Sequence, residues 1–113
     1  MKVPSVLVAA LILAVSGPAA AAAHDQIVQV SATGFSPSSA TIGLGSHVNF
    51  VVHDNAPHQI AMASGPSSGE RKPTVLERRN STDLIMFTEA GTYTYVDRLH
   101  PKAHPFHLIV RPH

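Results

Sequence analysis

Residues 91–110 read GTYTYVDRLHPKAHPFHLIV and contain two strand patterns separated by a polar loop. In the first pattern, Asp97 shares its parity with Tyr93 and Tyr95. Residues two apart on a strand point to the same face, which we interpret here as the inward face. A carboxylate buried at a strand end is costly unless it is paired, hydrogen-bonded or bound to a metal. The stretch therefore predicts a hairpin that carries a polar site at its loop end.

The same alternation recurs along the chain before this hairpin. Short runs rich in β-branched residues are separated by turn-forming Gly, Pro and Ser, which is typical of strands joined by turns. The predicted strands are 27–32, 40–44, 47–52, 58–63, 82–88, 92–97 and 106–111. About seven short strands predict one all-β domain folded as a sandwich. The polar break at 64–81 is expected to form a surface loop, with one helical turn at 75–79.

The first 23 residues have the pattern of a secretory signal peptide. Lys2 is followed by an apolar run at 6–15 and an alanine run at 19–23, and such a segment is removed on export. We therefore predict a signal peptide at 1–23 and one domain at 24–113, located in the periplasm or secreted. The apolar run is shorter than the ~20 residues that a transmembrane helix needs, so no membrane segment is expected after cleavage.

The composition excludes several classes of protein. The chain has no cysteine, so disulfides, iron–sulfur clusters and thiol redox chemistry are ruled out. Of its eight Lys and Arg residues Lys2 falls in the signal peptide, which leaves seven against seven Asp and Glu. This balance gives no electrostatic support for binding nucleic acid or an anionic membrane. All eight histidines follow residue 23, and this enrichment is a reason to look for a metal site.

Several spaced motifs, in order, resemble one known family. Gly-Thr-Tyr at 91–93 and Tyr-x-Asp-x-x-His-Pro at 95–101 resemble the last hairpin of the cupredoxins, such as plastocyanin, amicyanin and pseudoazurin. Residues 34–37, 41–50 and 56–59 are similar to the opening strands of that family and to its first histidine segment. The resemblance covers nearly all of the predicted domain, and it implies a cupredoxin-like Greek-key β-sandwich.

The resemblance also implies a set of metal ligands. His58 matches the family's first histidine ligand, and His100 matches the second. Asp97 stands where the family has its copper-binding cysteine, three residues before His100. In place of the axial methionine the loop offers His104. The predicted metal site is therefore His58, Asp97, His100 and His104.

The departure from the family pattern changes the expected metal chemistry. A type 1 copper site depends on a copper–thiolate bond, whereas an aspartate is a hard, anionic ligand that favours Cu(II) over Cu(I). A set of imidazole and carboxylate donors suits a tetragonal Cu(II) site or a tetrahedral zinc site. Copper is favoured by its affinity for such ligands and by the resemblance, and zinc stays open.

Each of these residues also has a purely structural interpretation. His58 and His100 would be structural histidines of a site that no longer binds metal. Asp97 would pair with Arg98 or cap a loop amide, and His104 would be solvated. These alternatives stay open on the sequence alone.

From the sequence we expect an exported, monomeric cupredoxin-like protein that binds copper for storage, for delivery to a periplasmic copper protein, or for buffering. One alternative is electron transfer through a carboxylate-ligated copper site. The other is a metal-free interaction module that keeps the cupredoxin fold. We do not expect an enzyme, because the sequence shows no nucleophile with a base, no paired carboxylates at catalytic spacing and no phosphate-binding loop.

Overall fold

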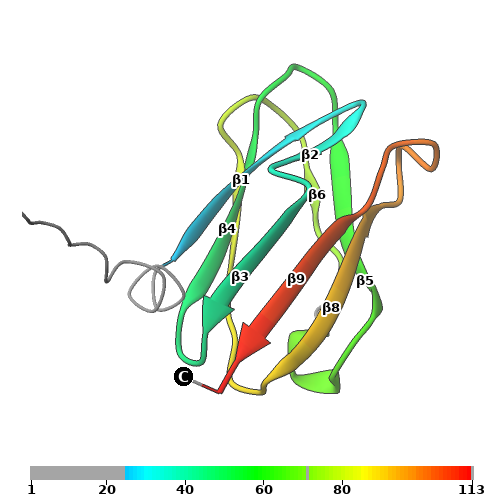
Figure 1. Ribbon diagram of the computed structural model, residues 1–113. Helices are drawn as coiled ribbons and strands as arrows, with labels where there is room; N and C mark the ends of the chain where they lie inside the picture. The colour runs from blue at the N-terminus through cyan, green and yellow to red at the C-terminus, as the bar shows by residue number, and fades with distance from the viewer. Residues whose placement is uncertain (1–24, 71, 113) are drawn as a thin grey trace, which may run out of the picture.

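The computed structural model describes residues 25–70 and 72–112, which form two β-sheets (Figure 1). The predicted signal peptide at 1–23 and the start of the predicted domain at residue 24 lie outside the described residues. The strands of the described part are β1 (Gln26–Ser31), β2 (Gly34–Ser36), β3 (Ser39–Gly43), β4 (His47–Val52), β5 (His58–Ser64), β6 (Val75–Leu76), β7 (Thr82–Met86), β8 (Gly91–Asp97) and β9 (Phe106–Arg111).

The two sheets have the orders β2-β1-β4-β7 and β3-β9-β8-β5-β6. The pairs β1–β4 and β3–β9 are parallel, and the other neighbouring pairs are antiparallel. Several strands that follow each other along the chain, such as β4 and β5 or β7 and β8, lie in different sheets. The chain therefore crosses repeatedly between the layers, and the predicted all-β sandwich is confirmed.

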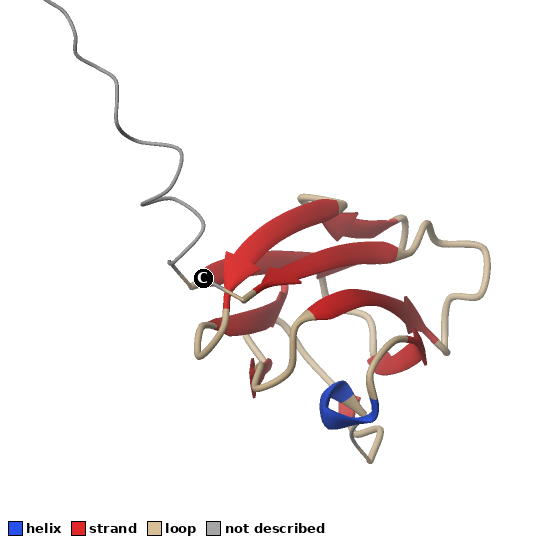
Figure 2. Cartoon of the chain, turned by 60° about the horizontal axis from the view of Figure 1, so that its bottom comes forward, coloured by secondary structure: helices blue, strands red, loops and turns tan. Residues whose placement is uncertain are grey.

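The predicted strands all occur, with small shifts at their ends, and the two short strands β2 and β6 are additions. The predicted helical turn at 75–79 is wrong, because Val75–Leu76 forms β6 and pairs with the start of β5. A short 3₁₀-helix lies earlier in the same loop, at Ser67–Gly69, and is the blue coil in Figure 2. No helix within the described residues is long and apolar enough to cross a membrane.

The core consists of the inward faces of the two sheets. Buried residues alternate with more accessible ones along β4, β8 and β9, as expected for strands with one buried face. The largest fully buried side chains are aromatic: Phe35, Phe50, Phe87, Tyr93, Tyr95 and Phe106. The ring of Phe50 lies centrally among them, with centroids 5.6 Å from both Tyr95 and Phe106. Asp97 continues the buried face of β8 beyond Tyr95, so the aromatic core adjoins the polar site.

Candidate metal centre

The strand register brings Asp97 next to the segment that carries His58. Asp97 ends β8 and lies opposite Ile60 of β5, two residues after His58. Both polar side chains are buried, with His58 fully inaccessible and Asp97 3% exposed. His100 follows in a turn, in which its backbone N–H donates to the Asp97 carbonyl over 3.1 Å. Two adjacent strand ends and one tight turn thus gather three side chains at one end of the sandwich.

The Asp97 carboxylate is the centre of this cluster. Its Oδ2 accepts hydrogen bonds from Nδ1 of His58, at 2.5 Å, and from Nδ1 of His100, at 2.9 Å. Its Oδ1 accepts from the backbone N–H groups of Gln59, at 3.0 Å, and Leu99, at 3.1 Å. Asp97 therefore accepts from one amide of β5 and one amide of the turn after β8 with one oxygen, and holds both histidines with the other. With Oδ1 committed to two amides, Oδ2 is the oxygen that can ligate an ion.

The imidazoles of His58 and His100 are stacked, with ring centroids 4.6 Å apart and planes inclined by 30°. The His58 side chain is fully buried, whereas that of His100 is 22% exposed. The site is therefore closed on the side of His58 and open to solvent at His100.

Asp54 is a fourth polar residue of the cluster and was not predicted from the sequence. Its Oδ1 lies 2.7 Å from Nε2 of His58. The only sequence signal was an aspartate four residues before the histidine in a predicted loop, and loop spacing does not fix which side chains meet. The cluster thus alternates carboxylate and imidazole in the order Asp54, His58, Asp97 and His100.

These contacts shift the protonation of the buried groups in opposite directions. Burial alone would lower the pKa of His58, but hydrogen bonds to Asp54 and Asp97, together with their charges, outweigh it and raise that pKa. For Asp97, burial alone would raise the pKa, but hydrogen bonds from His58, two backbone amides and His100 outweigh it and lower that pKa. The pKa of Asp54 is lowered too, with burial again opposed by the bond to His58. Without a metal ion, these contacts therefore favour the charged form of His58 and of both carboxylates.

We predict a maximum in the stability of the ion-free protein at weakly acidic pH. The raised pKa of His58, which faces Asp54, Asp97 and His100, stabilises the fold below about pH 6.5, and this stabilisation is lost as pH rises through the folded pKa. The lowered pKa values of Asp54 and Asp97 stabilise the fold above about pH 3.8, and this stabilisation is lost as pH falls through their folded values.

Urea unfolding with a chelator at each pH measures this dependence. The free energy of unfolding should decrease below about pH 3.8 and above about pH 6.5, and His58→Asn should remove the decrease at high pH. The exposed His107 provides the matched control, since His107→Asn should keep the decrease at both low and high pH. A stability that rises steadily from pH 6.5 to higher values would contradict the prediction.

The donor atoms of the cluster fit a transition-metal ion. One donor atom each from His58, Asp97 and His100 lie within 4.8 Å of one another. Two ligands that are each ~2.0–2.1 Å from an ion lie ~2.8–3.4 Å apart for tetragonal to tetrahedral angles. The distances from Asp97 Oδ2 to the two Nδ1 atoms, 2.5 and 2.9 Å, come close to this range. An ion that replaced the shared protons would therefore need only small movements of these side chains.

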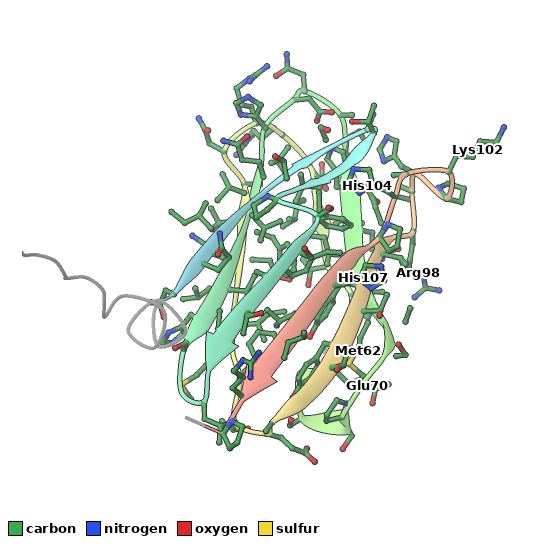
Figure 3. The ribbon with its side chains drawn as sticks, in the orientation of Figure 1. Met62, Glu70, Arg98, Lys102, His104 and His107 are labelled. Atoms are coloured by element: carbon green, nitrogen blue, oxygen red, sulfur yellow. The ribbon has the colours of Figure 1, made fainter. Side chains whose placement is uncertain are left out.

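His104, the other predicted ligand, is not part of this group. Its side chain is exposed, and its backbone N–H donates to the Thr33 carbonyl over 3.2 Å. Its ring lies against Gly34, where a Cβ atom would come within 2.4 Å of it. Figure 3 shows His104 at the loop end and His107 further along β9. The structure thus brings together three of the four predicted ligands.

Comparison with known proteins identifies the family. The model of the cupredoxin-like domain matches residues 5–110, and the chain belongs to this family. Amicyanin from Paracoccus versutus (Thiobacillus versutus) is 26% identical, with a TM-score of 0.66, over 77% of this chain and 81% of that chain. A purple cupredoxin from Nitrosopumilus maritimus is 21% identical, with a TM-score of 0.59, over 76% of this chain and 99% of that chain. No curated protein in the comparison matches significantly.

The predicted family and fold are therefore confirmed, and the fold suggests copper binding or electron transfer. Within that fold the cluster consists of two imidazoles and a carboxylate, and the sequence holds no thiol. Its chemistry is that of a nitrogen and oxygen donor set.

Proposed function

We propose that the protein binds one Cu(II) ion through Nδ1 of His58, Oδ2 of Asp97 and Nδ1 of His100. The observation that carries this proposal is the convergence of both Nδ1 atoms on Oδ2 of Asp97, at 2.5 and 2.9 Å. Copper is the preferred ion because it binds nitrogen and oxygen donors most tightly among the divalent first-row metals. Zinc is the competing ion, since the same donors suit it. A bound copper ion would stay in the Cu(II) state, because the site has no thiolate to favour Cu(I).

The role that follows is copper storage, delivery or buffering outside the cytosol, by a monomer without enzymatic activity. The buried His58 and the partly exposed His100 support this role, because an ion held between them is shielded on one side and accessible on the other. A periplasmic copper protein that accepts or supplies the ion is the corresponding partner.

Titration of the purified protein with Cu(II) tests this proposal. We expect one tight equivalent, an electron paramagnetic resonance signal of Cu(II) with nitrogen ligands, and no intense blue absorption. Asp97→Ala should weaken this binding by more than ~100-fold, because even residues behind the ligands contribute ~10–100-fold. The control His107→Ala removes an exposed imidazole and should leave the tight equivalent unchanged.

Weak binding of several equivalents that is indifferent to Asp97 would overturn the proposal. An unfolding temperature unchanged by both Cu(II) and Zn(II) would do the same, because a ligand that binds only the folded state must raise it. Either result would favour a metal-free interaction module.

Electron transfer is the second candidate function. The observation in its favour is the fixed position of Asp97, whose two oxygens together accept four hydrogen bonds. A rigid ligand set lowers the rearrangement between the two oxidation states of copper. Voltammetry of the copper-loaded protein distinguishes the two roles, since a reversible couple supports electron transfer and loss of the ion on reduction supports storage or delivery.

A further inference from the structure

Asp54 lies in the loop between β4 and β5, and both oxygens of its carboxylate have hydrogen-bond partners. Oδ1 lies 2.7 Å from Nε2 of His58 and accepts from the backbone N–H of Ala56 over 3.1 Å. Oδ2 accepts from the backbone N–H of Ala32, in the turn between β1 and β2, over 3.0 Å. The carboxylate thus joins three separate parts of the chain: its own loop, the β1–β2 turn and the His58 ring.

The backbone beside Asp54 is fixed independently of its side chain. The N–H of His53 donates to the Val30 carbonyl over 2.9 Å, which extends the pairing of β1 and β4. Nη1 of Arg79 donates to the His53 carbonyl over 2.6 Å. Asp54 therefore contacts His58 from a segment whose backbone is held by hydrogen bonds at the preceding residue, His53.

The contact decides which nitrogen of His58 faces the proposed ion. A metal-binding histidine commonly donates its other ring N–H to a carboxylate, which fixes the tautomer and the ring orientation and makes the ligand nitrogen more basic. With Nε2–H donated to Asp54, only Nδ1 of His58 is directed at Asp97 and His100. In a fully buried ring this orientation has no competing partner from solvent.

The charges of the cluster point to a preference among ions. Asp54 and Asp97 supply two negative charges, and both imidazoles are neutral when an ion has replaced the shared protons. A divalent ion is then neutralised, whereas a monovalent ion leaves one uncompensated negative charge near a buried ring, which is costly.

We propose that Asp54 is a positioning residue of the metal centre, which holds His58 in the Nδ1-facing orientation and selects a divalent ion over Cu(I). This inference rests on the proposed metal binding by His58, Asp97 and His100. It adds to that proposal the source of the second negative charge that balances a divalent ion. That charge comes from Asp54, a carboxylate that does not contact the ion.

The test compares Asp54→Asn with the wild type for Cu(II), Zn(II) and Cu(I), the last under anaerobic reducing conditions. Asparagine keeps the size and one acceptor oxygen and loses the charge. We expect Cu(II) and Zn(II) affinities to fall ~10–100-fold, and the Cu(I) affinity to fall much less. The matched control is Asp25→Asn, which removes a carboxylate that contacts His47 outside the site at 3.3 Å. This control should leave all three affinities unchanged.

A second readout separates positioning from a general loss of structure. Nitrogen-15 NMR of the Zn(II)-loaded wild type should show one state of His58, protonated at Nε2 and bound through Nδ1. In Asp54→Ala, His58 should no longer be confined to that one state. Urea unfolding of the ion-free variants measures how far the loop contacts alone contribute to stability.

The outcomes are distinct. If Asp54→Asn loses equal affinity for Cu(I) and for the divalent ions, Asp54 has only a structural role and the inference is overturned. Divalent affinities that stay at the wild-type level would overturn it as well. In both cases the wild type still binds, so the proposed function stands. A wild type that binds none of the three ions at His58 would overturn the proposed function and this inference with it.

Discussion

The Asp97→Cys variant, loaded with Cu(II), is expected to become intensely blue. The substitution places a sulfur where Oδ2 of Asp97 now meets both Nδ1 atoms, and two imidazoles with one thiolate are the ligands of a blue copper site. The amides of Gln59 and Leu99, which now donate to Oδ1, would remain beside the sulfur. A cysteine side chain is no larger than that of aspartate, so the buried position should accept it.

Visible absorption and electron paramagnetic resonance measure this conversion, and voltammetry should show a reduction potential raised above that of the wild type. Arg98→Cys is the matched control, because it introduces the thiol at the next, exposed position and should give no such band. A colourless Asp97→Cys protein that still folds and binds copper would contradict the assignment of position 97 as a ligand.

The Phe50→Ala variant is expected to lose much of the stability of the fold. Phe50 is fully buried, and its ring lies 5.7 Å from Phe35 and 5.6 Å from Tyr95 and Phe106, measured between centroids. Truncation of such a side chain costs about 3–5 kcal/mol, against a total of about 5–15 kcal/mol for a typical domain. No disulfide can compensate, because the chain has no cysteine.

Urea unfolding of the ion-free protein measures this loss. Leu84→Ala on the adjacent strand β7 is the control, since Leu84 is 55% exposed and its truncation should cost well under 1 kcal/mol. Equal losses for the two variants would mean that the aromatic cluster is not the main source of stability.

The strands were predictable where alternation runs for five or more residues. β4, β8 and β9 bury every second residue, so their sequences carry the period directly. β2 and β6 have three and two residues, too few to show a period. Residues 75–76 form a strand because β5 offers a partner, with His58 opposite Leu76, and no local pattern encodes such a partner.

The site was predictable to the extent that strands position it. Parity placed Asp97 on the inward face, and the pairing of Ile60 with Asp97 brings that carboxylate next to the buried His58. Asp54 and His104 lie in loops, where no period exists. The contact of His104 with Gly34 and that of Asp54 with His58 depend on how distant segments pack.

The unequal burial of the two stacked imidazoles sets the order in which an ion would exchange. His58 is shut off from solvent, whereas His100 is 22% exposed and belongs to a turn rather than a strand. Dissociation of the proposed ion should therefore begin at His100. An acceptor molecule that approaches residues 98–103 would then supply a replacement ligand before the bond between the ion and His58 breaks. Transfer by such a route avoids a free ion, and its rate would rise with acceptor concentration.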